Sequence, residues 1–211
     1  MATGAAPAEV AAKRPTGVWS NETVRTFIAV ELIAELRRPL IKLLRGLPRS
    51  SEIKWCTEHQ LHITLKFLGD VTDAQLAKVC DAAKSAGTGV APFSLRVKGL
   101  GCFPAPRNPR VLWCGIEDLT NGCRRWVERA DPLLEELNFK PETRAFTPHI
   151  TLGRSRSTAG GDVLRQVLDT TPPPQTGEML VQQIVVFESR LLPGGAQYHP
   201  LATLPLRGQS T

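Results

Sequence analysis

A tetrapeptide that occurs twice constrains this chain more than any other feature. His62-Ile63-Thr64-Leu65 is repeated, letter for letter, as His149-Ile150-Thr151-Leu152. Side chains leave a β-strand alternately from its two faces, so the histidine and threonine of each copy share one face. The isoleucine and leucine share the other face, which we expect to join a hydrophobic core. Histidine occurs only 4 times in the chain, and half of these residues head the repeated pattern. The repeat therefore predicts a fold that brings two imidazoles and two hydroxyls to one site.

The composition is typical of a globular protein with a basic surface. Hydrophobic residues make up 42% of the 211 residues and charged residues 22%, and the net charge is +6 with a pI near 9.3. This charge suits a polyanionic partner such as RNA. No apolar run approaches the roughly 18 residues of a membrane span, so we expect no membrane partner. Residues 1–20 are rich in Ala, Pro and Gly and are expected to form a disordered tail. Residues 21–211 should form one bilobed domain.

The cysteines argue against both disulfides and a metal site. Their number is odd, and no pair has the spacing of a zinc site. They are Cys56, Cys80, Cys102, Cys114 and Cys123. Reduced thiols in a cytoplasmic protein are the expectation.

Hydrophobic periodicity predicts strand, helix, tetrapeptide strand and helix before residue 90, and a looser version of this order after it. The expected strands are 24–30, 62–68, 93–98, 111–115, 149–152 and 182–191, with a short extended piece at 53–55. The expected helices are 32–47, 73–86, 119–137 and 162–168. Residues 99–110 are expected to be a loop. The two tetrapeptides lie 87 positions apart, which suggests a duplication. Turn residues after both copies favour α+β lobes with antiparallel sheets over a parallel sheet.

Two histidines in one cleft can act as acid and base in a single turnover, because imidazole titrates near neutral pH. A threonine hydroxyl two residues on supplies a neutral hydrogen-bond donor for a phosphate. The chain has no GxxxxGK[ST], GxGxxG, GxSxG or HExxH motif, and no Asp/Glu cluster with metal spacing accompanies either histidine. These features favour acid–base opening of a phosphodiester without a metal or cofactor. A single copy of the tetrapeptide would more simply be a structural strand, and only the repetition favours a site.

Other residues carry weaker signals. Arg154 lies five positions after His149, so an ideal strand places it on the opposite face, although Gly153 could redirect it. Trp55, Trp113 and Trp126 are expected in the core rather than as platforms for bases.

Four segments carry a resemblance to a known family. They are RTFIAVEL (25–32), KWCTEHQLHITLKFLGDV (54–71), PRVLWCGI (109–116) and FTPHITLGR (146–154). In this order they resemble the 2H phosphoesterase superfamily and, within it, the RNA 2′,3′-cyclic phosphodiesterase family, also called 2′-5′ RNA ligase-like. The likeness covers roughly residues 24–205.

The resemblance implies a bilobed α+β fold with pseudo-twofold symmetry, in which antiparallel sheets flanked by helices surround a central cleft. It implies hydrolysis of RNA 2′,3′-cyclic phosphate ends to 2′-phosphomonoesters, without metal or cofactor. His62 would give a proton to the departing ribose oxygen, and His149 would take one from water. Thr64 and Thr151 would hold the phosphate oxygens, and Arg154 would bind substrate. A monomer is expected.

Three alternatives remain open at this point. The reaction could run backwards as 2′-5′ RNA ligation, since the same groups serve both directions. The cleft could bind RNA or nucleotides without turnover. A metal-dependent hydrolase is the weakest alternative, because the chain lacks a pattern of metal ligands.

Overall fold

The computed structural model describes residues 23–193 and 195–209, so the expected tail at 1–20 lies outside the described residues. The strands are β1 (Thr23–Glu31), β2 (Ile53–Trp55), β3 (His62–Thr72), β4 (Phe93–Phe103), β5 (Val111–Glu117), β6 (His149–Ser155), β7 (Glu178–Val181), β8 (Gln183–Leu192) and β9 (Gly195–Pro205). The helices are α1 (Ala34–Gly46), the short 3-10 helix η1 (Glu58–Gln60), α2 (Asp73–Thr88), α3 (Gly122–Glu135) and α4 (Thr158–Thr170).

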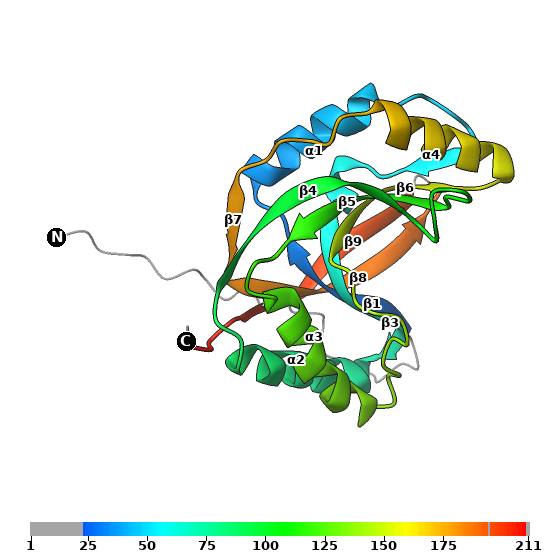
Figure 1. Cartoon of the computed structure of the whole chain (residues 1–211). Coiled ribbons are helices and arrows are strands. Elements are labelled where there is room, and N and C mark those ends of the chain that lie inside the picture. The colour runs from blue at the N-terminus through cyan, green and yellow to red at the C-terminus, as the bar shows by residue number, and fades with distance from the viewer. Residues whose placement is uncertain (1–22, 194, 210–211) are drawn as a thin grey trace.

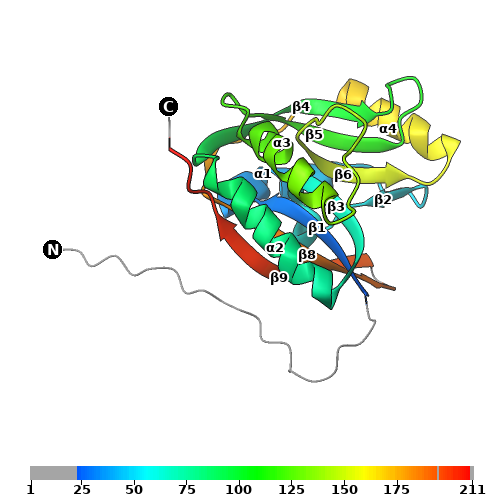
Figure 2. The ribbon, with the colours of Figure 1, turned by 90° about the horizontal axis from the view of Figure 1, so that it is seen from below.

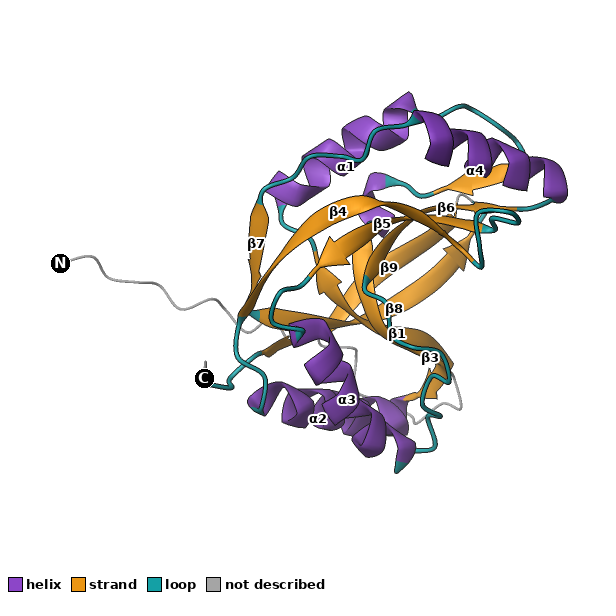
Figure 3. Cartoon of the chain, in the orientation of Figure 1, coloured by secondary structure: helices purple, strands orange, loops and turns teal. Residues whose placement is uncertain are grey.

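The nine strands found in the described residues belong to one curled sheet, in which every pairing is antiparallel. The order along the main path is β7-β4-β5-β6-β3-β1-β8-β9, and β2 pairs with β6 beside this path. We call β3, β1, β8 and β9 the first lobe, and β6, β5, β4 and β7 with β2 the second lobe (Figures 1 and 3). The order is symmetric about the junction of β3 and β6. The expected α+β fold with two antiparallel lobes is confirmed, and each tetrapeptide opens the strand at its lobe's inner edge.

The helices form two groups around the curled sheet. Figure 1 shows α1 and α4 above the curved strands and α2 with α3 below them, and Figure 2 shows the α2 and α3 layer from beneath. Helix α2 packs against α3 and against β3 and β9 of the first lobe. No helix in the described part of the chain is long and apolar enough to cross a bilayer.

Helix boundaries follow the sequence closely at α2. The Thr72 hydroxyl accepts a hydrogen bond from the Gln75 amide, and the Gln75 side chain accepts one from the Thr72 amide, which is a capping box. The helix continues to Thr88, past the predicted end at 86. Pro39 and Pro132 lie inside α1 and α3 rather than at helix boundaries.

Two strand predictions ended too early, and two strands were not predicted. Strand β3 does not end near Gly69, but continues to Thr72 with Gly69 at φ +75°, a backbone conformation that glycine adopts without strain. Strand β4 continues to Phe103 through part of the expected loop 99–110, because it pairs with β5 along that length. Strands β7 and β9 were missed, and the four residues of β7 are too few for a periodic signal.

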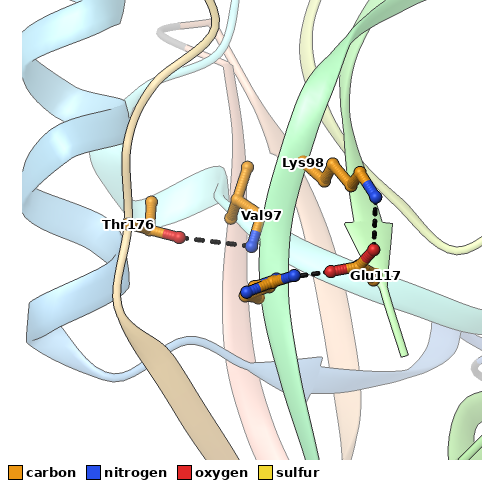
Figure 4. Close-up of polar contacts among 5 residues, drawn as sticks. Val97, Lys98, Glu117 and Thr176 are labelled. Atoms are coloured by element: carbon orange, nitrogen blue, oxygen red, sulfur yellow. Dashed lines mark hydrogen bonds and ion pairs between the residues drawn. The ribbon is translucent and has the colours of Figure 1, made fainter. Parts of the chain in front are cut away.

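The segment before β7 is held against β4 by a side chain. Thr176 Oγ1 accepts a hydrogen bond from the Val97 amide at 3.2 Å (Figure 4). On the neighbouring strand β5, the Glu117 carboxylate accepts hydrogen bonds from Lys98 and Arg96 of β4. These hydrogen bonds lower the pKa of Glu117, and the one from Lys98 has the larger effect. These contacts fix the outer strands of the second lobe.

Candidate active site

The two tetrapeptides meet at a single paired position, Ile63 of β3 with Ile150 of β6. The strands are antiparallel, so the register one residue to either side places His62 opposite Thr151 and Thr64 opposite His149. Ile63 and Ile150 are fully buried, and their leucine companions are 5% and 0% exposed. The expected core face is therefore confirmed, and the four polar side chains share the other face, which we call the site face.

A β-bulge recurs at the same place in both copies. In β3, Thr64 pairs with Ala29 and Lys66 with Ile28, and in β6, Thr151 pairs with Trp113 and Gly153 with Leu112. In each copy the leucine of the tetrapeptide is the extra residue. A bulge reverses the alternation of side chains beyond it. The fifth residue after each histidine therefore returns to the site face.

This bulge corrects the geometry expected for Arg154. An ideal strand would place it away from His149, but its pairing with Val111 follows the bulge and puts it on the site face. The equivalent residue of the first lobe is Phe67, which pairs with Phe27 and is 51% exposed. The Arg25 guanidinium lies 4.8 Å from the centre of the Phe67 ring. Sequence reasoning missed Phe67, because its environment depends on the same bulge.

Each catalytic candidate histidine is oriented by the carbonyl two residues before it. The Nδ1 atom of His62 lies 2.8 Å from the Gln60 carbonyl oxygen, and that of His149 lies 2.7 Å from the Thr147 carbonyl oxygen. A carbonyl oxygen only accepts, so Nδ1 carries the proton in both rings. The neutral Nε2 atoms are then left as acceptors. Nε2 of His62 lies 2.9 Å from Thr64 Oγ1, which donates to it.

Burial and the charge of Arg154 lower the pKa of both imidazoles. The pKa of His62 is lowered to about 4, chiefly by burial and also by the charges of His149 and Arg154, while the hydrogen bond to the Gln60 carbonyl opposes the shift. Burial also lowers the pKa of His149, with a contribution from Arg154. The guanidinium therefore acts on both rings, which places its charge at the shared centre. Both histidines are neutral at pH 7 in the free protein, and a bound anion would raise both pKa values.

An aromatic ring lies edge-on beside each imidazole. Tyr198 of β9 is 5.2 Å from His62 at an interplanar angle of 90°, and Phe103 of β4 is 5.1 Å from His149 at 81°. A second ring contacts each imidazole at a tilted angle: Phe27 lies 4.8 Å from His62, and Trp113 lies 6.0 Å from His149. These contacts restrict the imidazole rotamers in both lobes.

The predicted core position holds for Trp126 but is wrong for Trp113. Trp126 is fully buried, and Trp55 is half-buried at the edge of the main core. Trp113 pairs with Thr151 on the site face and belongs to neither hydrophobic cluster. A Cβ on Gly101, the residue paired with Trp113, would lie 2.2 Å from the indole, so the glycine makes room for this ring.

Two clefts meet at the site face. The larger, about 720 Å³, begins at Thr64 and His149 and continues between α3 and the loop 140–147, with Phe67 and Phe103 on its walls. Its charged side chains are Lys66, Arg124, Glu128, Asp131, Lys140, Glu142 and Arg144. The smaller cleft, about 160 Å³, lies on the other side of His62 beside Tyr198 and Arg37. The large cleft has the size of small-molecule sites in proteins.

No group of three or more His, Cys, Asp or Glu side chains within residues 23–193 and 195–209 is arranged to hold a metal ion. The five cysteines are free thiols. The chemistry that this arrangement can perform with its own groups is proton transfer between two imidazoles and a bound anion.

The chain matches the family model for LigT-like phosphoesterases over residues 30–113 and 116–198. Each matched segment contains one copy of the tetrapeptide, and together they span most of the chain. The chain belongs to this family. The LigT-like relatives include the RNA 2′,3′-cyclic phosphodiesterase of Methanothermobacter thermautotrophicus, which is 31% identical over 178 residues, covering 83% of this chain and 95% of the relative.

Solved LigT-like structures have the same fold. A crystal structure from Thermus thermophilus has a TM-score of 0.70 and 29% identity, and the match covers 88% of this chain and all of the other. Escherichia coli LigT in complex with NADP⁺ has a TM-score of 0.71 and 26% identity, over 88% of this chain and 99% of LigT. The recognised superfamily and the fold expected from it are thus confirmed.

Proposed function

We propose that this protein hydrolyses 2′,3′-cyclic phosphates at RNA ends to 2′-phosphomonoesters by acid–base catalysis that uses two histidines and no metal. One observation carries the proposal: antiparallel pairing at Ile63 and Ile150 leaves both imidazoles and both hydroxyls on one face beside a cleft. The name of the Methanothermobacter relative, an RNA 2′,3′-cyclic phosphodiesterase, supports the same reaction.

The proposed reaction uses one histidine from each lobe, His149 as the base and His62 as the acid. His149 takes a proton from water through Nε2, which its Nδ1 hydrogen bond leaves as an acceptor. The water oxygen bonds to phosphorus, the bond from phosphorus to the ribose 3′ oxygen breaks, and His62 gives that oxygen a proton. His62 must first become protonated. The negative charge of the bound phosphate favours this, because it opposes the burial that lowers the His62 pKa.

The remaining site residues bind the substrate in this proposal. Thr64 and Thr151 donate to the non-bridging phosphate oxygens, and Arg154 offsets the charge that develops there. The large cleft takes the terminal nucleoside, with Phe67 as a flat apolar surface for the base.

We propose further that residues 21–211 act as one catalytic unit, that the protein is a monomer and that it is cytoplasmic. Five free thiols support a reducing compartment.

The deciding experiment is incubation of the protein with a 2′,3′-cyclic nucleotide in excess EDTA, with chromatography that resolves 2′- from 3′-phosphates. Exclusive formation of the 2′-phosphate is the expected result. Binding without product would establish a nucleotide-binding module instead, and loss of activity in EDTA would indicate a metal hydrolase. Formation of 2′-5′ linked product from mixed cyclic-phosphate and 5′-hydroxyl ends would show the reverse reaction.

A further inference from the structure

Strand β2 places a second cation beside the catalytic centre. Strand β3 pairs with β6 only at Ile150, and β2 takes the same edge of β6 from Gly153 to Ser155. Lys54 pairs directly with Arg154. Paired residues of neighbouring strands lie on the same face, so the Lys54 side chain shares the site face with Arg154.

Among the residues that the structure describes, the two positive charges have no acidic partner. Lys54 and Arg154 are both exposed, and neither side chain makes an ion pair or hydrogen bond within residues 23–193 and 195–209. Like charges directly opposite each other on a sheet are destabilising. Glu52, the acidic residue directly before β2, accepts a hydrogen bond from the Ser157 hydroxyl, and the Arg156 amide donates to its carbonyl oxygen. An unneutralised pair at this position is the expected feature of an anion-binding site.

A single phosphate does not account for both cations. Arg154 is close enough to His62 and His149 to affect their titration, so it faces the reacting phosphate. Lys54 lies one strand farther from the centre, and its charge is felt at Cys56 but is not among the causes that act on either imidazole. The large cleft lies toward α3 and is lined by neither cation. The substrate can therefore extend in two directions from the histidines.

We propose that Lys54, paired with Arg154, forms a second anion subsite that takes the first internucleotide phosphate of an RNA end. This inference rests on the proposed function, because it assigns the terminal nucleoside to the large cleft and its cyclic phosphate to the histidines. Lys54 then distinguishes oligonucleotide ends from mononucleotides. It is a specificity residue, and the chemical step does not require it.

The test compares three substrates, of which only one has a negatively charged internucleotide linkage. They are 2′,3′-cyclic AMP, the dinucleotide ApA with a terminal 2′,3′-cyclic phosphate, and the same dinucleotide with an uncharged methylphosphonate linkage. We expect Lys54→Gln to raise KM for the charged dinucleotide about tenfold, the loss of one charge-assisted contact. Rates with the other two substrates should stay within about twofold of wild type. Lys54→Arg should retain the preference, and Lys78→Gln, on the exposed surface of α2, is the matched control.

Salt dependence gives an independent readout. The slope of log KM against log salt concentration for the charged dinucleotide should fall by about 0.7 in Lys54→Gln, the value for one phosphate contact on a single strand. Equal effects on all three substrates, or no effect on any, would overturn the subsite.

Failure of the proposed function would look different. If the wild-type protein hydrolyses none of the substrates, calorimetric titration with 2′-phosphorylated ApA and its methylphosphonate analogue still measures the contact. Wild type should then bind the charged ligand more tightly, and Lys54→Gln should bind the two equally. Equal binding of both ligands by wild type would reject the subsite.

Discussion

Ile63 and Ile150 lie opposite each other at the one paired position that joins β3 to β6. Both side chains are fully buried, so the register of this junction is set by the core beneath it. A slip of one residue in either strand would turn that strand's isoleucine to solvent and its histidine into the core. The two halves of the site are thus aligned by hydrophobic packing on the face that the substrate never meets.

Removal of either imidazole should abolish most of the activity without unfolding the protein. We expect His62→Ala and His149→Ala each to lower kcat for a 2′,3′-cyclic nucleotide by about 10²–10⁴, the contribution of general acid–base catalysis. The double variant should lose little more than the worse single one, because the two groups act in one step. Wild-type activity in either variant would refute the assignment.

A substrate with a changed leaving group should distinguish the acid role of His62 from the base role of His149. In a substrate whose 3′ oxygen is replaced by sulfur, the departing thiolate does not need a proton. His62→Ala should then recover much of its lost rate, while His149→Ala should stay slow because water still requires a base. The opposite result would exchange the two histidines.

The pH profile should reflect the lowered pKa values of both histidines. The acid must be protonated and the base neutral, so kcat/KM peaks between the two pKa values of the free protein. Both lie below the usual value near 6.5, and we therefore expect an optimum below pH 6.5. Arg154→Gln removes a positive charge that lowers both pKa values, so its optimum should move to higher pH even as activity falls.

The same shift makes the fold sensitive to acid. Burial lowers the pKa of His62 to about 4, so the unfolded state binds this proton more readily between that value and about pH 6.5. Stability from the neutral ring is complete above pH 6.5 and is lost as pH falls toward 4. In urea unfolding, His62→Gln should lose less stability than wild type between pH 6.5 and 4.5. NMR titration of His62 should give a midpoint near 4, and a midpoint of 6.5 would contradict the argument.

The ion pair of Lys66 and Asp131 should respond asymmetrically to substitution. Lys66 of β3 is 6% exposed and its Nζ lies 2.5 Å from Oδ1 of Asp131 in α3, which is 24% exposed. Asp131→Asn leaves a buried ammonium without its partner and should cost about 3 kcal/mol of unfolding free energy. Lys66→Met leaves only a carboxylate that can reach water, and should cost about half as much or less. Equal losses in urea denaturation would contradict this interpretation.

Gly101 should matter through the ring of Trp113. In Gly101→Ala the new methyl would lie 2.2 Å from the indole, so the ring must leave its place beside Thr151. We expect a changed tryptophan fluorescence spectrum, a destabilisation of about 1–3 kcal/mol and a loss of kcat/KM of about tenfold. Gly46→Ala is the control, since nothing lies within 4 Å of its added Cβ. Unchanged fluorescence and activity in Gly101→Ala would show that the site tolerates the shift.

Much of the site could be predicted because its information is local. Alternation along four residues puts His62 and Thr64 on one face and Ile63 and Leu65 on the other, whatever the rest of the chain does. The capping box at Thr72 and the helical spacing after residue 32 are equally short-range. These features depend on backbone geometry and on burial of apolar side chains, which neighbours in the sequence already specify.

Only the tertiary structure decided which other side chains join the histidines. The bulges at Leu65 and Leu152 return Phe67 and Arg154 to the site face, and they exist only through pairing with strands distant in sequence. The partnership of Lys54 with Arg154 joins residues 100 positions apart. Register between such strands is set by the whole core and its long-range contacts, so it cannot be obtained from the residues of either strand alone.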